Sequence, residues 1–370
     1  MTKVCILTSV HPPFDTRIFH KEAKSLAQAG YDVTLIAQHD KEETVDGIRI
    51  IPLPKPKNRF ERMTKTVWMV YRKALNINAD IYHLHDPELL YIGLLLKYNC
   101  SKAKIIFDMH EMTDYQINLK DWLYKPIRKP ISRIYACIEK AIVRKLDALV
   151  VPQPYMLSRY SDYSGTIVCV ENFINPPNFI PCNQEKKKII FHVGTLSEDR
   201  GLFNMLDVMF YLKNKDVVFV LAGDLGSSLL FEKVKAHPSW EKVDYVGRLS
   251  SDEGKKYYLK STIGLILNNN VGQYFLSYAT KLFEYMSYGI PVVMPNFGEW
   301  PKFNNENNCG ICVNVNNAEA IACIINELFD NTGKMMMLGT NGRKAIESKY
   351  NWSIAEKRLL RLYRDLICKS

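Results

Sequence analysis

The sequence predicts an α/β protein made of two doubly wound domains that face each other across a cleft. Short apolar runs alternate with amphipathic stretches of helical period, an order typical of parallel sheets covered by helices on both faces. The alternation stops once, in the Pro- and Asn-rich segment 175–188, and then restarts. A length of 370 residues also exceeds one domain of about 150 residues. We therefore expect a first domain over residues 1–182 and a second over residues 183–350.

The first half contains apolar runs bounded by polar or turn residues, which predict strands. They cover Lys3–Thr8, Asp32–Ala37, Asp80–His85, Lys104–Asp108, Ala148–Val151 and Ile167–Val170. Between them, apolar residues recur at helical spacing and predict helices over Arg17–Ala29, Pro87–Tyr98 and Ile131–Leu146.

The second half repeats this pattern after the polar segment. Strands are expected over Ile189–Val193, Val217–Ala222, Val243–Val246, Ile263–Leu267, Pro291–Met294 and Ile311–Val315. A basic amphipathic helix is expected at the end of the chain, over Trp352–Ile367. In open parallel sheets, ligands bind outside the carboxyl ends of the strands, so the loops at those ends are the place to look for a site.

The composition is that of an ordinary globular protein, with 47% hydrophobic and 24% charged residues. The longest uncharged stretch, 261–280, is too polar for a membrane span, and the N-terminus has no signal-peptide pattern, so a cytoplasmic protein is expected. Nine scattered cysteines indicate reduced, buried thiols. The single C-x-x-C, Cys309 to Cys312, has no second pair, so a metal or redox role for it is disfavoured.

Basic charge is concentrated in two segments. Residues 55–73 and 120–145 each carry a net charge of +6, within a chain whose formal charge is +10. Both segments also hold aromatic and aliphatic residues, including Trp68, Trp122 and Tyr124, which favours an anionic membrane surface over solvated helix faces. Nucleic-acid binding would rest on charge alone, without a recognition motif, so no nucleic-acid partner is expected.

Two motifs in the second half point to a phosphate site. Gly194 follows a strand and precedes a helix, so the backbone can approach a ligand, and Arg200 adds a charge that can form two hydrogen bonds. Thr280 and Glu284 lie one turn apart at the start of another helix, where Glu284 could accept hydrogen bonds from sugar hydroxyls. From spacing alone, an ordinary turn and an exposed glutamate remain open alternatives.

In the first half, two loops end at the same edge of the predicted sheet. They are the loop His11–Arg17 and the loop that carries His110. His83 and His85 alternate along one strand and so share a face, and with His110 and a carboxylate they could form a metal site, an alternative we disfavour. The chain lacks G-x-G-x-x-G, P-loop and G-x-S-x-G motifs, so dehydrogenase, kinase and hydrolase functions lose their usual support.

These segments resemble a known family. VGTLSEDRGL (193–202) and KLFEYMSYGIPVV (281–293) are similar to the two signature segments of retaining GT-B glycosyltransferases of family four. Segments 9–37, 83–90, 104–111 and 170–177 resemble the acceptor domain of a bacterial branch of that family. NWSIAEKRLLRLYRDL (351–366) resembles its terminal helix, which implies that residues 351–370 pack back onto the first domain. The resemblance implies the GT-B fold, with two Rossmann-like domains.

The resemblance also implies roles for individual residues. The second domain would bind a nucleotide-sugar donor, with the diphosphate near Arg200 and the ribose on Glu284. His110 would contact the donor sugar, so His110, Arg200 and Glu284 are the expected catalytic residues. The resemblance implies no metal and no other cofactor. The expected donor-binding residues are Gly194, Thr195, Arg200, Arg248, Thr280, Lys281 and Glu284, and the expected acceptor-binding residues are Phe14, Asp15, Thr16 and Arg17.

The implied activity is retaining transfer of a hexosyl or N-acetylhexosaminyl group from a UDP-sugar, or secondly a GDP-sugar. The acceptor would be a hydroxyl of a lipid-linked saccharide in bacterial polysaccharide synthesis, and the enzyme would be peripheral on the inner face of the plasma membrane. Two positions depart from the family pattern, because Leu276 replaces the first signature glutamate and Thr195 replaces the arginine after the glycine. A nucleotide-sugar epimerase of the same fold and a non-catalytic sugar-nucleotide-binding protein remain alternatives.

Overall fold

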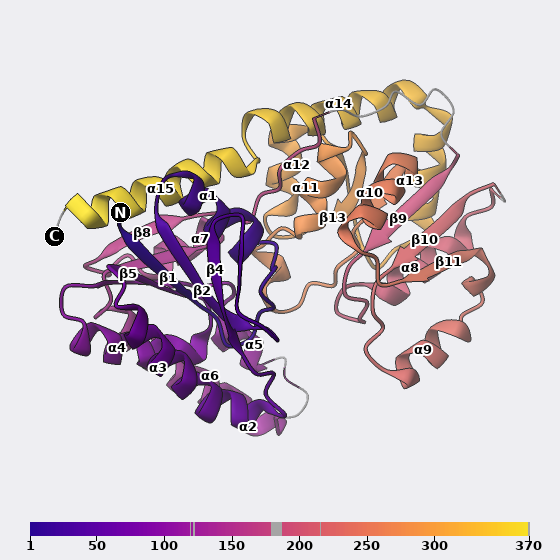
Figure 1. The fold of residues 1–370 in the computed structure, drawn as a ribbon. Helices are drawn as coiled ribbons and strands as arrows, with labels where there is room; N and C mark the ends of the chain where they lie inside the picture. Colours follow the sequence, from indigo (N-terminus) through magenta and orange to yellow (C-terminus); the bar gives the residue numbers. More distant parts are fainter. Residues whose placement is uncertain (119, 121–122, 179–186, 215, 369–370) are drawn as a thin grey trace. The chain divides into compact units, whose positions relative to one another are not determined.

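The computed structural model describes residues 1–118, 120, 123–178, 187–214 and 216–368, which form two compact units (Figure 1). Unit 1 comprises Met1–Asn172 and Trp352–Ser370, and unit 2 comprises Phe173–Asn351.

The boundary between the units differs from the one expected from the sequence. The expected boundary followed residue 182, whereas residues 173–178 belong to unit 2. The ring of Phe173 packs edge-on against Phe283 and Tyr350 of that unit, at centroid distances of 5.1 and 5.5 Å. Residues 179–182, with Cys182, lie outside the described residues.

Unit 1 contains an eight-stranded sheet in the order β3-β4-β2-β1-β5-β6-β7-β8. All neighbouring strands are parallel except β3 and β4, which form an antiparallel hairpin that the sequence reading missed. The Asp46-Gly47 turn that joins these two strands has positive φ at both residues, as a tight hairpin requires. The strands are β1 (Lys3–Leu7), β2 (Asp32–Gln38), β3 (Glu43–Val45), β4 (Ile48–Leu53), β5 (Ile81–Leu84), β6 (Lys104–Asp108), β7 (Ala148–Val151) and β8 (Thr166–Cys169).

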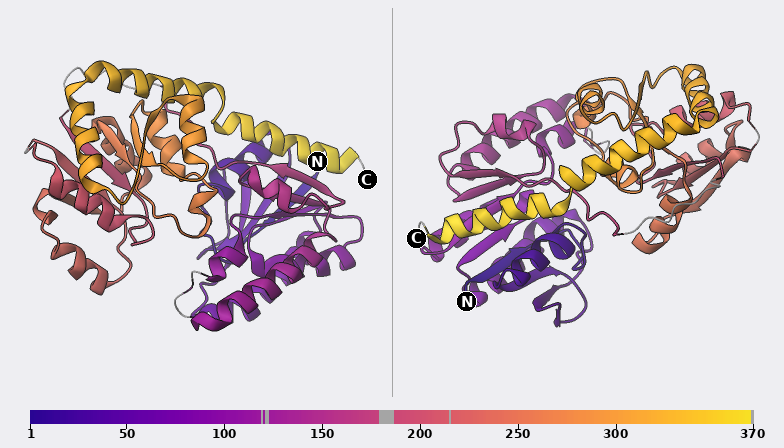
Figure 2. Two further views of the ribbon diagram at one scale, coloured as in Figure 1. Left: turned by 180° about the vertical axis from the view of Figure 1, so that it is seen from behind. Right: turned by 90° about the horizontal axis from the view of Figure 1, so that it is seen from above.

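Helices cover both faces of this sheet (Figures 1 and 2). Helices α3, α4 and α6 pack on one face through a large apolar core, and η1, α1 and α15 lie on the other. The helices, with η marking short 3₁₀ or π-helical segments, are η1 (Ile18–Ala23), α1 (Lys24–Gln28), α2 (Arg59–Glu61), η2 (Arg62–Thr66), α3 (Val67–Ile77), η3 (Pro87–Leu89), α4 (Leu90–Asn99), α5 (Thr113–Asn118), α6 (Lys125–Val143), α7 (Tyr155–Arg159) and α15 (Trp352–Cys368).

Alternation along the strands sorts side chains between the two faces. Tyr82 and Leu84 of β5 enter the apolar core beneath α3 and α4. His83 therefore points to the opposite face, where its Nδ1 lies 2.8 Å from the hydroxyl of Tyr363 on α15. Trp352, at the start of α15, donates from its indole N–H to Ser25 at 3.0 Å. The last helix of the chain thus completes a face of the sheet formed by the first residues.

Unit 2 contains a six-stranded parallel sheet in the order β11-β10-β9-β12-β13-β14. Its strands are β9 (Ile189–Val193), β10 (Val218–Ala222), β11 (Val243–Gly247), β12 (Ile263–Leu265), β13 (Val292–Pro295) and β14 (Gly310–Val313). Its helices are α8 (Leu202–Tyr211), α9 (Ser228–Lys235), η4 (Trp240–Lys242), α10 (Ser251–Lys260), η5 (Gly272–Phe275), α11 (Thr280–Ser287), α12 (Trp300–Asn307), α13 (Ala318–Asp330) and α14 (Thr332–Ser348).

Each sheet has a point where the strand order reverses. In unit 1 the chain proceeds outward from β1 through β2, and later from β5 in the other direction, so the reversal lies between β1 and β5. In unit 2 it lies between β9 and β12. Loops that leave the carboxyl ends of these strands therefore diverge to opposite faces and leave room for a ligand.

The hydrogen bond between α15 and β5 yields a stability prediction. Tyr363→Phe is expected to lower the free energy of unfolding by about 1–3 kcal/mol, because Nδ1 of the buried His83 loses its partner. Urea unfolding followed by circular dichroism would measure this. Tyr98→Phe is the control, because Tyr98 is 86% exposed. Equal midpoints for the two variants would contradict the prediction.

Candidate functional site

The carboxyl end of β9 in unit 2 presents its backbone to a ligand. Gly194 follows β9 with φ of +136°, a backbone conformation that residues other than glycine rarely adopt. Gly201, with φ of +74°, ends the loop where α8 begins, and a Cβ there would lie 1.8 Å from the carbonyl oxygen of Leu267. The loop Gly194–Gly201 is therefore held tightly against the segment that leaves β12, at the point where the strand order reverses.

Two basic side chains converge on this loop. A Cβ at Gly194 would lie 3.0 Å from Nζ of Lys281 and 3.9 Å from Nη1 of Arg200. The Nζ of Lys281 also lies 3.0 Å from Nε2 of His192. Because Nδ1 of His192 lies 2.8 Å from the carbonyl oxygen of Leu265, it must carry the proton, and its Nε2 accepts from Lys281.

The electrostatics of this cluster favour an anion. Burial, with the nearby charge of Arg200, lowers the pKa of Lys281 to about 7. Burial and the charge of Lys281 likewise hold the pKa of His192 well below its ordinary value. Burial is the main cause of both shifts, and neighbouring positive charge adds to each, so a bound phosphate group would raise both pKa values.

The remaining residues expected at the donor site are spread around this centre. Glu284 lies one turn into α11, and its Oε2 accepts a hydrogen bond of 2.5 Å from the hydroxyl of Tyr258. Thr280 opens α11 and is exposed, as is Thr195. Arg248 is exposed and follows β11, whose last residue, Gly247, accepts a hydrogen bond of 2.7 Å from the backbone N–H of Gly223 directly after β10.

In unit 1, the carboxyl edge of the sheet is organised by a buried ion pair. Arg17 donates to both carboxylate oxygens of Asp108, at 3.1 and 2.8 Å, and to the carbonyl oxygen of Val170 at 3.0 Å. Arg17 was expected to contact an acceptor, but it is only 5% exposed and its guanidinium is engaged by these internal partners. Burial alone would raise the pKa of Asp108, but Arg17 holds it below its ordinary value.

The other residues of the acceptor loop remain near the surface. Phe14 is 42% exposed and packs edge-on against Phe19, and Thr16 is exposed. Asp15 accepts from the backbone N–H groups of Arg17 and Ile18, at 2.8 and 2.9 Å. Phe14 and Thr16 are thus free to meet a ligand, whereas Asp15 mainly shapes the loop.

His110 follows β6 and is partly exposed at this edge. Its Nε2 lies 3.0 Å from Nδ1 of His85, and its ring centroid lies 5.0 Å from that of His11. Burial lowers the pKa of His110. The pKa of His11 is raised despite its burial, because Asp15 and Asp86 stabilise the charged ring. His110 is therefore the histidine of this pair that is more readily neutral.

One group of four described residues has the side chains of a metal site. Glu22, His83, His85 and Asp108 each place a ligand atom within 4.8 Å of the others. However, Nε of Arg17 lies 2.9 Å from Glu22, and the same guanidinium binds Asp108. Burial and the neighbouring Asp108 raise the pKa of Glu22 well above its ordinary range, which favours the neutral carboxyl. Arg17 then balances Asp108, and the cluster needs no cation for charge balance.

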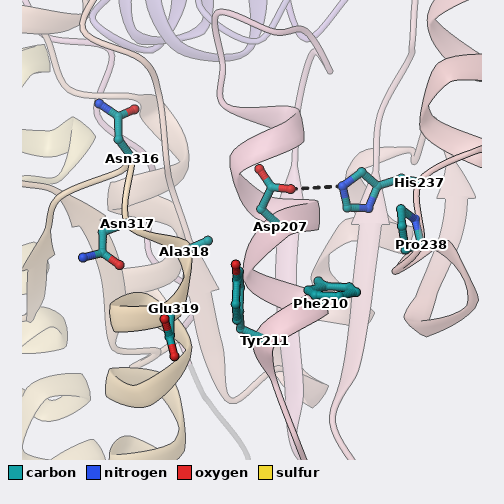
Figure 3. Close-up of a pocket in the computed structure, with 9 residues that line it drawn as sticks. All are labelled: Asp207, Phe210, Tyr211, His237, Pro238, Asn316, Asn317, Ala318 and Glu319. Atoms are coloured by element: carbon teal, nitrogen blue, oxygen red, sulfur yellow. Dashed lines mark hydrogen bonds and ion pairs between the residues drawn. The ribbon is translucent and has the colours of Figure 1, made fainter.

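A separate cavity of about 540 Å³ lies elsewhere in unit 2 (Figure 3). A hydrogen bond of 3.1 Å between Asp207 and His237 lies beside Phe210 and Tyr211 at the end of α8. The Gly194 loop precedes the start of α8, and a helix of ten residues is about 15 Å long. The cavity is therefore distinct from the basic cluster.

Sequence reasoning missed three features of these sites. It placed Lys281 among the donor-binding residues but did not predict that the side chain of this lysine reaches Gly194. It did not single out His192, whose buried ring orients that lysine. It also did not pair Arg17 with Asp108. An isolated buried-strand histidine or helix lysine carries no distinctive spacing, so only three-dimensional proximity could identify these groups.

Two family models match the chain in succession. The model described as Glycosyltransferase Family 4 matches residues 16–177, and the model described as Glycosyl transferases group 1 matches residues 179–345. An uncharacterized glycosyltransferase of Methanocaldococcus jannaschii is 21% identical over 98% of both chains. An uncharacterized 41.2 kDa protein in the cps region of Klebsiella pneumoniae is 22% identical over 70% of this chain and 72% of its own length.

Solved structures share the fold. Sucrose-phosphate synthase from Thermosynechococcus elongatus matches with a TM-score of 0.80 at 17% identity, covering 100% of both chains. Anabaena HepE in complex with UDP and glucose matches with a TM-score of 0.75 at 11% identity, covering 99% of this chain and 100% of its own. Both sheets and their helices thus correspond to the GT-B fold.

The buried lysine gives a pH-dependent stability prediction. Between about pH 7 and pH 10 the unfolded chain holds a proton on Lys281 that the folded chain releases, so the parent gains stability relative to Lys281→Met as pH rises. The difference in unfolding free energy should change by up to about 1.4 kcal/mol per pH unit. Urea unfolding at several pH values would measure it. The exposed Lys256→Met is the control, and equal slopes for the two variants would contradict the prediction.

Proposed function

Because this chain belongs to the family-four glycosyltransferases of the GT-B fold, which use nucleotide-sugar donors, we propose a specific reaction for it. It transfers a hexosyl or N-acetylhexosaminyl group from a UDP-sugar, with retention, to a hydroxyl of a lipid-linked saccharide. The observation that carries the proposal is the convergence of Lys281 and Arg200 on Gly194 at the carboxyl end of β9. This arrangement has the charge, the donors and the open backbone that a diphosphate needs.

The proposed donor site assigns each group a part. Arg200 and the side chain of Lys281 bind the diphosphate, together with the backbone N–H groups of the first turn of α11. Lys281 thereby supplies the positive charge that the family pattern places at position 195. Glu284 accepts a hydrogen bond from the ribose, while Tyr258 holds its other oxygen in place.

The proposed chemistry is a front-face displacement. The bond between the anomeric carbon and the diphosphate oxygen breaks, and the acceptor oxygen bonds to that carbon from the same side. The departing diphosphate oxygen takes the acceptor's proton, so no separate base is required. Arg200 and Lys281 stabilise the charge that develops on the diphosphate, which is the largest contribution expected from the protein. His110 orients the donor sugar by a hydrogen bond to a hydroxyl.

The comparisons support the choice of donor and acceptor class. The HepE structures contain UDP, which favours UDP over GDP as the nucleotide here. The Klebsiella relative is encoded in a cps region, which supports a role in surface-polysaccharide assembly. The exposed Phe14 and Thr16 of the loop after β1 would contact the acceptor sugar. Leu276 stands in place of the first signature glutamate. The alternative to a transferase is therefore a non-catalytic protein that binds a sugar nucleotide.

The surface of unit 1 supports association with an anionic membrane. On α6 the exposed Ile127, Ile131, Ile134 and Ile138 recur at helical spacing, on a helix that also carries exposed Lys129 and Arg133. In segment 55–73, Phe60, Met63 and Trp68 are likewise exposed, by 79%, 54% and 44%. Helices α3 and α6 cover the same face of the sheet (Figure 1). Trp122 lies outside the described residues.

No helix among the described residues is long and apolar enough to cross a bilayer. From the exposed apolar and basic residues of α6 we propose that unit 1 binds at the membrane surface. Apolar side chains of α6 would enter the interface while the flanking basic groups contact anionic headgroups.

Arg200→Ala is expected to weaken UDP binding and to lower turnover by about 10²-fold or more, because a charged donor to the leaving diphosphate is lost. Lys281→Met should weaken UDP binding as well, whereas the exposed Lys256→Met should not. Calorimetric titration with UDP and GDP, followed by product analysis with UDP-sugars and an extracted lipid acceptor, would test this. Binding without transfer would favour the non-catalytic alternative, and release of an epimerised sugar nucleotide would favour an epimerase.

The chain is expected to sediment with vesicles that contain phosphatidylglycerol and not with vesicles of phosphatidylcholine alone. Each basic residue near such a surface contributes roughly 1 kcal/mol at low salt. Replacing Ile131 and Ile134 with Asp should abolish sedimentation. Leu229→Asp is the control, because Leu229 is 69% exposed but lies on α9 of unit 2. Equal binding of all variants would show that the stripe on α6 is not the contact.

A further inference from the structure

His83 on β5 and His85 directly after this strand are both buried, but they have different hydrogen-bond partners. His83 and His85 are 0% and 1% exposed, and both project to the sheet face covered by η1 and α15. Nδ1 of His83 lies 2.8 Å from the hydroxyl of Tyr363, whereas Nδ1 of His85 lies 3.0 Å from Nε2 of His110. Only His85 therefore connects the buried cluster to a partly exposed side chain at the carboxyl edge.

We propose that His85 is a positioning residue for His110: it engages Nε2 of His110 and so leaves Nδ1 of that ring, with its proton, to meet the substrate. The proposal rests on the proposed function in one respect, since it takes the sugar as the partner of Nδ1. Beyond the proposed function, it specifies that Nδ1 of His110 carries the proton and meets the substrate. It also specifies that buried residues around His85 set this tautomer.

The direction of the hydrogen bond follows from the groups around His85. Its Nδ1 also lies 3.8 Å from Oδ2 of Asp108, which Arg17 keeps ionised, so a proton on this nitrogen is favoured. Its Nε2 lies 3.6 Å from Oε2 of Glu22, whose pKa is raised well above its ordinary range by burial and by Asp108, so this carboxyl attracts a proton to Nε2 less than the ionised Asp108 attracts one to Nδ1. His85 thus carries its proton on Nδ1 and donates to His110.

The tautomer of His110 follows from this. Burial favours the neutral ring, and a neutral ring that accepts at Nε2 carries its proton on Nδ1. His110 then presents the N–H of Nδ1 as a hydrogen-bond donor to a sugar oxygen. Because Nδ1 has no free lone pair, it cannot take the proton of the acceptor hydroxyl. This is the state required of an orienting group, as distinct from a general base.

The test compares substitutions at His85 that keep or remove the contact. Asn at position 85 can place its amide nitrogen near the former Nδ1 and donate to His110, whereas Leu cannot. His85→Leu is expected to lower kcat roughly 10- to 100-fold with little change in the KM of the donor, because His110 loses its orientation. His85→Asn should recover most of that loss. His83→Leu is the matched control, expected to reduce stability while kcat stays within about threefold of the parent.

A second measurement does not depend on activity. Two-bond ¹H–¹⁵N correlation spectra of labelled protein report the tautomer of each histidine, and His110→Gln assigns the His110 signals. The parent, His85→Asn and His83→Leu should show His110 protonated on Nδ1, and His85→Leu should show a mixture of tautomers. If His85→Leu does not fold, His85→Gln replaces it, because a Gln amide reaches toward Glu22 and not toward His110.

An unchanged His110 tautomer in folded His85→Leu would overturn the proposal. A parent protein in which His110 carries its proton on Nε2 would overturn it as well. Equal losses of kcat in His83→Leu and His85→Leu would assign both histidines to stability alone. If the chain proved to have no transferase activity, the spectra would still decide whether His85 sets the state of His110. Failure of the proposed function and failure of this inference are therefore distinguishable.

Discussion

The buried ion pair between Arg17 and Asp108 is the interaction on which the carboxyl edge of unit 1 depends. It joins the loop after β1 to the end of β6, and a further hydrogen bond to Val170 extends it to the segment after β8. Removing two charges from water is costly, and only good geometry with several hydrogen bonds offsets that cost. Arg17 meets this condition by binding both oxygens of the carboxylate. The positions of Phe14 before it and His110 beyond Asp108 follow from this link.

Unit 2 uses the opposite electrostatic arrangement at the equivalent edge of its sheet. There, Lys281 and Arg200 lie near one another, and the buried lysine bonds a neutral histidine in place of a carboxylate. Such a cluster is unfavourable for stability alone, since burial penalises the ammonium and the neighbouring guanidinium repels it. Residues that lower stability in this way are common at binding sites. The balanced cluster of unit 1 and the unbalanced cluster of unit 2 thus indicate different tasks, one of positioning and one of binding an anion.

Much of the architecture could be predicted from the sequence, because period-two and helical patterns are local. The strands over Lys104–Asp108, Ala148–Val151 and Ile189–Val193 have the predicted bounds. The hairpin β3–β4 was missed because its first strand is short and polar, although Asp46-Gly47 is a typical hairpin turn. Membership of Phe173 in unit 2 was also missed, because it depends on aromatic packing with Phe283 and Tyr350, which are distant in sequence.

The sequence by itself determined which residues reach the two sheet edges. Strand alternation put His83 and His85 on one face, and the turn after β9 exposed the backbone at Gly194, because both depend only on local backbone geometry. Only the tertiary structure decided what these residues touch. Arg17 is withdrawn from solvent by Asp108, the side chain of Lys281 reaches Gly194, and His85 meets His110 while His83 meets Tyr363 near the end of the chain. Such contacts join residues far apart in sequence and depend on differences of a few ångströms, which no local pattern specifies.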